Sequence, residues 1–123
     1  MNRIVYFEIH APDPHKAIEF YKTNFGWTFH KSEGGAFEYW MVETGDKNSP
    51  GINGGLMPSR DGQPRTVNTL EVDDVDAAAT KVEKTGGTIV VPKMAIAGVG
   101  WVAYATDPGG NIFGLYKNDP NAK

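Results

Sequence analysis

The sequence of 123 residues predicts a single α+β domain, residues 1–123. Two tandem βαβββ modules are expected to form a curved eight-stranded mixed sheet around a cleft, with the helices outside. Three observations support this prediction. The length suits one domain with its own hydrophobic core. Each half of the chain starts with a strand pattern, continues with a helix that an aspartate precedes, and ends with further strands. A shift of 61 residues also places Asp13 on Asp74 and Trp40 on Trp101.

The first module covers about residues 1–57 and begins with a strand at 3–11. Every second residue of this segment is apolar, which is the period of a strand with one buried face. Asp13-Pro14 predicts a helix start, because aspartate caps free amide groups and proline needs no amide hydrogen at the first position. Gly26 is expected to end the helix. The remaining strands are predicted at 28–31, 37–44 and 51–57.

Residues 58–65 are rich in proline, glycine and polar side chains, and we interpret them as the linker between the modules. The second module, about residues 66–118, repeats the order of the first. A strand at 67–72 precedes a helix that Asp74 or Asp76 can cap and that Gly86-Gly87 ends. Further strands are predicted at 88–91, 101–106 and 111–116. The linker allows the modules to pair within one chain or by exchange between two chains.

Two modules placed edge to edge leave one face of the joint sheet without a helix. Alternation along the first strand of each module assigns side chains to this concave face. They are Tyr6, Glu8 and His10 in the first module, and Val67, Thr69 and Glu71 in the second. A concave surface lined by aromatic and polar groups is typical of a ligand site.

The composition excludes several classes of protein. A net charge of −3 and a pI near 5.5 argue against a nucleic-acid or anionic-membrane partner, since both need clustered basic residues. The absence of cysteine excludes disulfides and thiolate metal sites. No run approaches the roughly 20 apolar residues of a membrane span, and the first residues lack a signal-peptide pattern. We therefore expect a cytoplasmic protein.

Five motifs follow one another along almost the whole chain. They are Phe7-Glu8-Ile9; Asp13-Pro14 with Phe20-Tyr21 and Phe25-Gly26-Trp27; Val72-Asp73-Asp74-Val75-Asp76-Ala77-Ala78; Gly86-Gly87; and Asp107-Pro108-Gly109-Gly110-Asn111. In these motifs the chain resembles the vicinal oxygen chelate superfamily, which includes glyoxalase I, bleomycin- and fosfomycin-resistance proteins, and extradiol dioxygenases. The resemblance implies the fold more than the reaction, because this fold carries isomerases, transferases, dioxygenases and binding proteins.

The resemblance also implies where a metal would lie. Many enzymes of the family hold a divalent metal by His and Glu, with one ligand from the first strand and one from the last strand of each module. The corresponding residues here are Tyr6, Gly55, Val67 and Gly114. Valine and glycine have no side chain that binds a metal, and tyrosine is a rare ligand. We therefore expect no metal or other cofactor at these positions, unlike in an ordinary glyoxalase or dioxygenase.

Other residues are candidates for function. Glu8, His10 and Glu71 share the predicted concave face and could act as catalytic acid and base groups or hold a relocated divalent metal. Aromatic side chains in the central strands could stack on a ligand, although they suit the core or a dimer interface equally well. The predicted ligand-binding residues are Tyr6, His10, Trp40, Trp101 and Tyr104, with Tyr39 as a further candidate for the cleft wall.

Three hypotheses for function follow. The preferred one is a metal-independent protein, similar to the glyoxalase and bleomycin-resistance proteins, that binds a small molecule, such as an aromatic compound, in its cleft. The resemblance implies a homodimer in this case, since drug-binding members place the cleft between two subunits. The alternative is a lyase- or isomerase-like enzyme that uses Glu8, His10 or Glu71. An accessory domain that acts through protein contacts is the third hypothesis.

Overall fold

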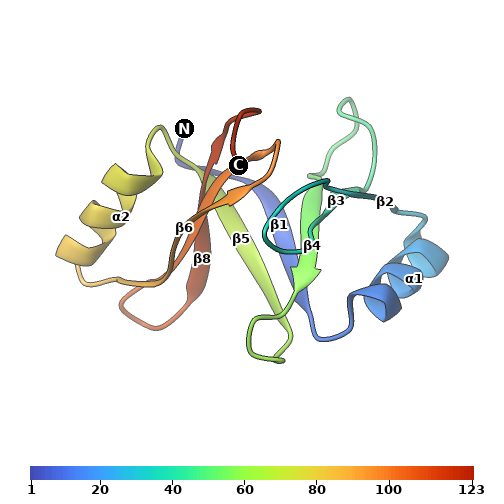
Figure 1. Ribbon diagram of the computed structural model, residues 1–123, viewed down its shortest axis with the longest axis horizontal. Helices are drawn as coiled ribbons and strands as arrows, with labels where there is room; N and C mark the ends of the chain where they lie inside the picture. The colour runs from blue at the N-terminus through green and yellow to red at the C-terminus, as the bar shows by residue number, and fades with distance from the viewer.

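The computed structural model describes all residues, 1–123, and contains two helices and one open eight-stranded sheet. The order of the strands is β2-β3-β4-β1-β5-β8-β7-β6, and the helices lie at opposite ends of the molecule with the strands between them (Figure 1). The elements are β1 (Arg3–Ala11), α1 (Pro14–Phe25), β2 (Thr28–Lys31), β3 (Trp40–Glu43), β4 (Gly54–Pro58), β5 (Arg65–Glu71), α2 (Val75–Lys84), β6 (Thr88–Ile96), β7 (Gly100–Thr106) and β8 (Ile112–Asn118). The predicted α+β fold is confirmed.

The two modules meet where β1 and β5 pair in antiparallel fashion at the centre of the sheet. Within each module the first strand pairs in parallel with the last, β1 with β4 and β5 with β8. The two halves therefore repeat one topology, as the 61-residue shift predicts. Both modules belong to the same chain, so one chain forms the whole sheet in this structure.

Both helices begin as the sequence predicts. The Asp13 carboxylate accepts a hydrogen bond from the amide of Lys16 at 3.3 Å, and Pro14 occupies the first helical position. The Asp74 carboxylate accepts from the amide of Ala77 at 3.0 Å. Gly26 ends α1 in the left-handed conformation, at φ 70°, which glycine adopts without steric cost.

Each helix covers an apolar cluster on the convex side of its own module. Under α1, the side chains of Phe7 and Ile9 pack with Leu56. Under α2, Ala103 and Leu115 form the corresponding apolar cluster. The alternation predicted for β1 is therefore confirmed, since its odd-numbered residues face the helix and leave the even-numbered ones on the concave face.

Side chains fill much of the predicted cleft. A third cluster covers the concave face, and it consists of Tyr39, Met57, Val67, Ile96, Val102 and Tyr104. Ile96 reaches this cluster because β6 continues to Ile96, five residues beyond the predicted end at 91, and turns there into β7. β3, in contrast, is shorter than the predicted strand at 37–44. The cleft is thus a core closed by β6, with open space only toward its edge.

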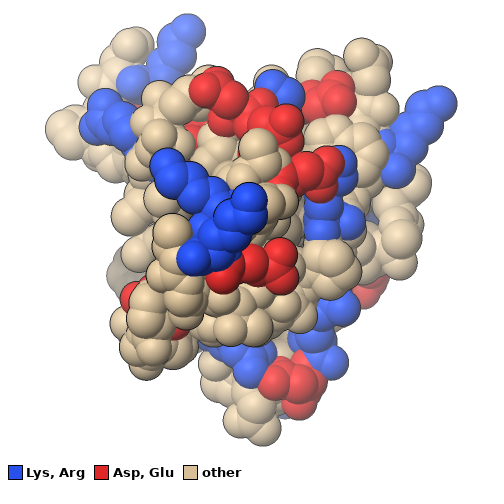
Figure 2. All heavy atoms as spheres, turned by 90° about the vertical axis from the view of Figure 1, so that its left-hand side faces the viewer, with Lys and Arg blue, Asp and Glu red and all other residues tan.

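The face of the molecule on the α2 side carries acidic and basic side chains in mixture, without a surface of one charge (Figure 2). One exposed pair on this side joins Lys93 of β6 to Asp76 of α2 at 2.7 Å. Neither helix is long and apolar enough to cross a membrane.

Candidate functional site

Glu8 lies at the centre of the concave face with its side chain fully buried, at 0% exposure. Its position follows from the register of the sheet, since β1 places Glu8 beside Gly55 of β4 and Val67 of β5. A buried carboxylate needs hydrogen-bond donors, because burial without them costs several kcal/mol. The question is therefore which groups supply these donors.

Three donors surround the Glu8 carboxylate. Tyr39 donates its hydroxyl to Oε2 at 2.7 Å, and His10 Nε2 lies 2.8 Å from Oε1. The hydroxyl of Tyr104, on β7, also donates to Oε1. Tyr39 comes from the first module and Tyr104 from the second, so Glu8 joins the two modules through their tyrosines. We call Glu8, His10, Tyr39 and Tyr104 the Glu8 network.

Burial keeps the tyrosines of this region protonated. It raises the pKa of Tyr39 and of Tyr104 well above the ordinary value of 10.0, and the nearby negative charge of Glu8 raises both further. The pKa of Tyr6 is raised for the same two reasons in the same order. These phenols therefore remain hydrogen-bond donors throughout the neutral range.

The raised tyrosine pKa values predict a loss of stability at alkaline pH. A group whose pKa is higher in the folded than in the unfolded protein adds stability that is complete below the unfolded value. This stability is lost as the pH rises from about 10 toward the folded value. Urea denaturation at increasing pH should therefore show a falling free energy of unfolding above about pH 10. Tyr39→Phe should weaken this dependence, whereas Tyr21→Phe, outside the Glu8 network, should keep it. Ultraviolet titration of Tyr39 near pH 10 in the folded protein would contradict the prediction.

Two buried hydroxyl groups beside the network have no hydrogen-bond partner. They are the hydroxyls of Tyr6 and Thr69, which face each other across the β1–β5 pair. Unpartnered buried hydroxyls are costly, and they mark a place where a water molecule or a polar ligand atom would be stabilised. This polar region lies on the Tyr6 side of Glu8.

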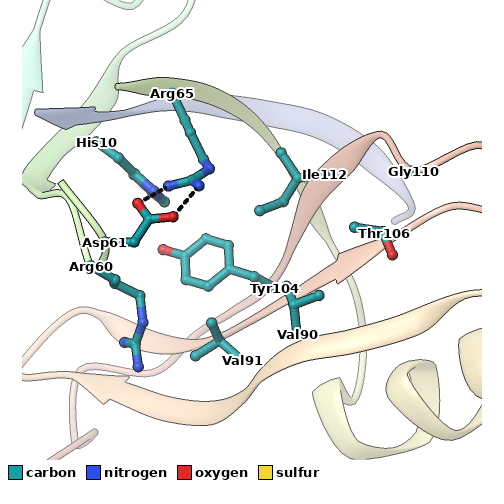
Figure 3. A pocket seen from close by; sticks show the side chains of 10 residues that line it. All are labelled: His10, Arg60, Asp61, Arg65, Val90, Val91, Tyr104, Thr106, Gly110 and Ile112. Atoms are coloured by element: carbon teal, nitrogen blue, oxygen red, sulfur yellow. Dashed lines mark hydrogen bonds and ion pairs between the residues drawn. The ribbon is translucent and has the colours of Figure 1, made fainter. Parts of the chain in front are cut away.

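A cavity of about 400 Å³ opens on the other side of the network, at the edge of the concave face. Figure 3 shows the ring of Tyr104 among the side chains that line this cavity, with its hydroxyl toward His10 and Asp61. The ring of His10 meets that of Tyr104 edge-on, with centroids 5.2 Å apart. The residues that line the cavity are His10, Arg60, Asp61, Arg65, Val90, Val91, Tyr104, Thr106, Gly110 and Ile112. His10 and Tyr104 therefore connect the buried carboxylate to an open space of ligand size.

Charged residues of the segment between the modules form one wall of the cavity. Arg65 donates two hydrogen bonds to the Asp61 carboxylate, at 2.7 and 2.5 Å, and this pairing lowers the pKa of Asp61 (Figure 3). Arg60 forms no ion pair, and its guanidinium contacts only the sulfur of Met94 at 3.8 Å. The cavity thus joins a charged wall to an apolar wall formed by Val90, Val91 and Ile112.

Comparison with known proteins identifies the family of this chain. The model of the Glyoxalase/Bleomycin resistance protein/Dioxygenase superfamily matches residues 3–115 of the chain. The chain belongs to this superfamily. The resemblance in the five sequence motifs is therefore confirmed.

Two relatives of this glyoxalase-superfamily chain are longer proteins. CFP32, a candidate glyoxylase of Mycobacterium tuberculosis, is 31% identical in an alignment of 113 positions that covers 89% of this chain and 43% of CFP32. DnrV of Streptomyces peucetius, an anthracycline biosynthesis protein, is 27% identical in an alignment of 125 positions that covers 91% of this chain and 46% of DnrV. The chain spans less than half the length of these curated relatives.

Solved structures of the superfamily share the fold. Methylmalonyl-CoA epimerase from Mycobacterium tuberculosis aligns with a TM-score of 0.66 at 18% identity, covering 94% of this chain and 87% of the epimerase. An epimerase from Streptomyces coelicolor, in complex with 2-nitronate-propionyl-CoA, aligns with a TM-score of 0.71 at 17% identity, covering 100% and 99%. At these identities the likeness extends to the fold alone.

Three of the four positions that correspond to metal ligands in the superfamily carry no ligand atom in this chain: Gly55, Val67 and Gly114. Gly55 and Gly114 offer no donor, and the space beside each is occupied. A Cβ on Gly55 would overlap the hydroxyl of Tyr39, and a Cβ on Gly114 would meet Thr69 Oγ1 at 3.1 Å. Val67 offers only methyl groups to the core. The residues at these positions therefore do not fit a divalent metal, and no group of three His, Asp or Glu side chains elsewhere in the chain is arranged to hold one.

The structure brings together four of the predicted site residues. Tyr6, Glu8, His10 and Tyr104 share the concave face, as expected from the alternation of β1. Glu71, in contrast, lies opposite Arg3 at the far end of β1, while His10 lies opposite Arg65. The predicted grouping of Glu71 with Glu8 and His10 is wrong, because β1 and β5 run in opposite directions.

Both predicted tryptophans lie on the helix side of the sheet, so the expectation that they line the cleft is wrong. Trp40 packs under α1 against Ala17 and Ile18. Trp101 packs under α2, and its indole nitrogen donates to Asp119 at 2.9 Å. Their equivalence in the repeat is confirmed, since each packs beneath its own helix, with Trp40 buried and Trp101 half-buried.

Several lining residues were not among the predicted site residues. Arg60, Asp61 and Arg65 all fall within the predicted linker at 58–65, where the sequence shows only charged residues among turn formers. Tyr39 was a candidate only as a cleft wall, whereas it donates to Glu8. A glutamate predicted on an inner face of the first strand could have indicated these donors, because a buried carboxylate is stabilised only by hydrogen-bond donors from elsewhere in the fold.

Proposed function

We propose that this member of the glyoxalase superfamily binds a small organic molecule at the edge of its concave face, without a metal ion. The observation that carries the proposal is the cavity of about 400 Å³, with Tyr104 and His10 on its inner side and aliphatic side chains opposite. Ligand sites combine apolar walls with a few fixed polar groups in this way. The Tyr104 ring is 1% exposed and is held by its hydrogen bond to Glu8, so it forms part of a rigid inner wall of the cavity.

The state of Glu8 supports the metal-independent part of the proposal. Its two oxygens already accept hydrogen bonds from His10, Tyr39 and Tyr104, so a metal ion would have to displace these donors. Tyr39 in addition fills the space beside Gly55. In this chain the centre that binds metal in related enzymes is proposed to act as a rigid support for the cavity.

The alternative function is acid–base catalysis on the bound molecule. One observation favours it: His10 Nε2 lies 2.8 Å from Glu8 Oε1, and His10 also lines the cavity. A carboxylate that orients an imidazole toward a ligand is a common arrangement for proton transfer. Glu71 has no part in this alternative, because it lies at the far end of β5.

Binding with and without a chelator tests the proposal. Titration of the isotope-labelled protein with a set of small aromatic and aliphatic compounds should shift amide resonances around the cavity, and EDTA should leave the affinity unchanged. Val90→Trp should abolish binding, because Val90 lines the cavity and is 46% exposed, so that an indole can cover the space without disturbing the core. Ile52→Trp, at an exposed loop position outside the cavity, is the matched control and should bind normally.

Several outcomes would contradict the proposal. Binding that requires added zinc, manganese or nickel would exclude metal independence. Resonance shifts confined to another surface, or a Val90→Trp variant that binds normally, would exclude the cavity. Conversion of a bound compound that is lost in His10→Gln while binding persists would favour the enzyme over the binding protein.

The homodimer and the cytoplasmic location stay predictions. Exposed aromatic side chains on α1, Phe20 and Phe25, offer an apolar surface for a contact between copies. Size-exclusion chromatography with light scattering measures the oligomeric state directly.

A further inference from the structure

The polar wall of the cavity has an excess of guanidinium groups. Arg65 is neutralised by Asp61 through two hydrogen bonds. Arg60 lines the same cavity and has no acidic partner, so its charge is available to a ligand. Figure 3 shows Arg60 beside Asp61 at one end of the cavity, with Thr106 and Gly110 at the other end and the Tyr104 ring between them.

The distribution of side chains is therefore that of an amphipathic site. A ligand that enters would place one end near Arg60 and its body against Val90, Val91 and Ile112. If that ligand were apolar throughout, it would remove water from the Arg60 guanidinium without replacing the lost hydrogen bonds. An anionic group would replace them with charge-assisted hydrogen bonds, for which the guanidinium is well suited.

We infer that the ligand of this cavity is an amphipathic organic anion, such as an aryl or alkyl carboxylate, whose anionic group binds Arg60. This inference rests on the proposed function and names the ligand class for the same site.

The two carboxylates near the cavity do not oppose this arrangement. Glu8 lies behind the rings of His10 and Tyr104, is fully buried and does not line the cavity. Asp61 directs both carboxylate oxygens toward Arg65. The anionic group is thus placed toward Arg60, at the mouth of the cavity and away from Glu8.

A pair of probes with the same shape and different charge tests the inference. We would titrate the protein with 1-naphthoate and with 1-naphthamide, and follow both by amide chemical shifts. We expect 1-naphthoate to bind the cavity more tightly than 1-naphthamide, and Arg60→Gln to weaken the naphthoate about fivefold to tenfold while leaving the naphthamide unchanged. Asp61→Asn should strengthen naphthoate binding, because it removes a negative charge and frees Arg65. Arg3→Gln is the matched control, since Arg3 lies at the opposite end of β1 from His10.

The two probes separate failure of the inference from failure of the proposed function. Equal binding of both probes, or an equal effect of Arg60→Gln on both, would overturn the anionic ligand and leave the binding site in place. An effect of Arg3→Gln as large as that of Arg60→Gln would reduce the preference to overall charge and overturn the inference as well. Failure of both probes to bind the cavity would count against the proposed function itself.

Discussion

Glu8→Ala should lower the free energy of unfolding by about 3 to 5 kcal/mol, because it removes the acceptor of three buried hydrogen bonds. The substitution leaves the hydroxyls of Tyr39 and Tyr104 and the His10 nitrogen buried without their acceptor. Each unsatisfied buried group costs about 1 to 3 kcal/mol. Because Tyr39 and Tyr104 belong to different modules, the loss also weakens the connection between the modules. Urea denaturation followed by tryptophan fluorescence measures the change.

Glu43→Ala is the matched control for this prediction. Glu43 is also a glutamate in a strand, but its side chain is exposed at the end of β3. Its replacement should change stability by no more than about 0.5 kcal/mol. The loss for Glu8→Gln should fall between those for Glu8→Ala and Glu43→Ala. The glutamine amide keeps one acceptor oxygen, but its NH₂ group would face other hydrogen-bond donors of the Glu8 network. A loss below about 1 kcal/mol for Glu8→Ala would mean that the Glu8 network does not hold the modules together.

The first strand shows how far periodicity can predict a site. The alternation of residues 3–11 assigns Glu8 and His10 to the concave face, and the structure confirms it. The prediction succeeds because a strand has a side-chain period of two and α1 follows directly, which identifies the face that the helix covers. The same argument placed Tyr6 beside Glu8.

The tryptophans show where periodicity fails. Around Trp101, the strand contains Val102, Ala103, Tyr104 and Ala105, which are apolar or aromatic on both faces. An apolar run of this kind has no alternation from which a face can be assigned. β7 is buried on both sides, by α2 and by the concave core. Neither face of the strand therefore needs polar side chains, and the sequence does not alternate.

The internal repeat led to the wrong prediction that Glu71 shares a site with His10. The 61-residue shift places His10 on Glu71, which suggests that they share a site. The first strands of the modules pair in antiparallel fashion, however, so equivalent positions near their ends lie at opposite ends of the pair. An internal repeat thus identifies equivalent residues, and the direction of the strands decides whether they meet.

The charged wall of the cavity could not be assigned from local patterns. Arg60 and Asp61 lie in the connection between β4 and β5, and they face Val90 and Val91 of β6 across about thirty residues of sequence. That contact depends on how β6 closes over the sheet. No periodicity within residues 58–65 contains this information.

Gly55→Ala should destabilise the protein by about 2 to 3 kcal/mol, combining the cost of overpacking with a lost hydrogen bond. The added methyl group would overlap the hydroxyl of Tyr39, which is 3% exposed and donates to Glu8 at 2.7 Å. Tyr39 cannot move aside without breaking that hydrogen bond. Gly45→Ala is the matched control, because a Cβ there meets only Ser49 Oγ, at 3.4 Å, and stability should be unchanged or slightly higher.

A double-mutant cycle with Tyr39→Leu makes the argument specific. The shorter leucine leaves room beside Gly55, so Gly55→Ala should cost less than about 1 kcal/mol in this background, and the two effects should not add. Additive effects would show that Tyr39 does not fill the space beside Gly55. In that case a ligand side chain could be accommodated at this position of the superfamily, and the metal-independent function would lose its main structural support. Non-additive effects would mean that a phenol holds Glu8 where related enzymes place a metal ligand.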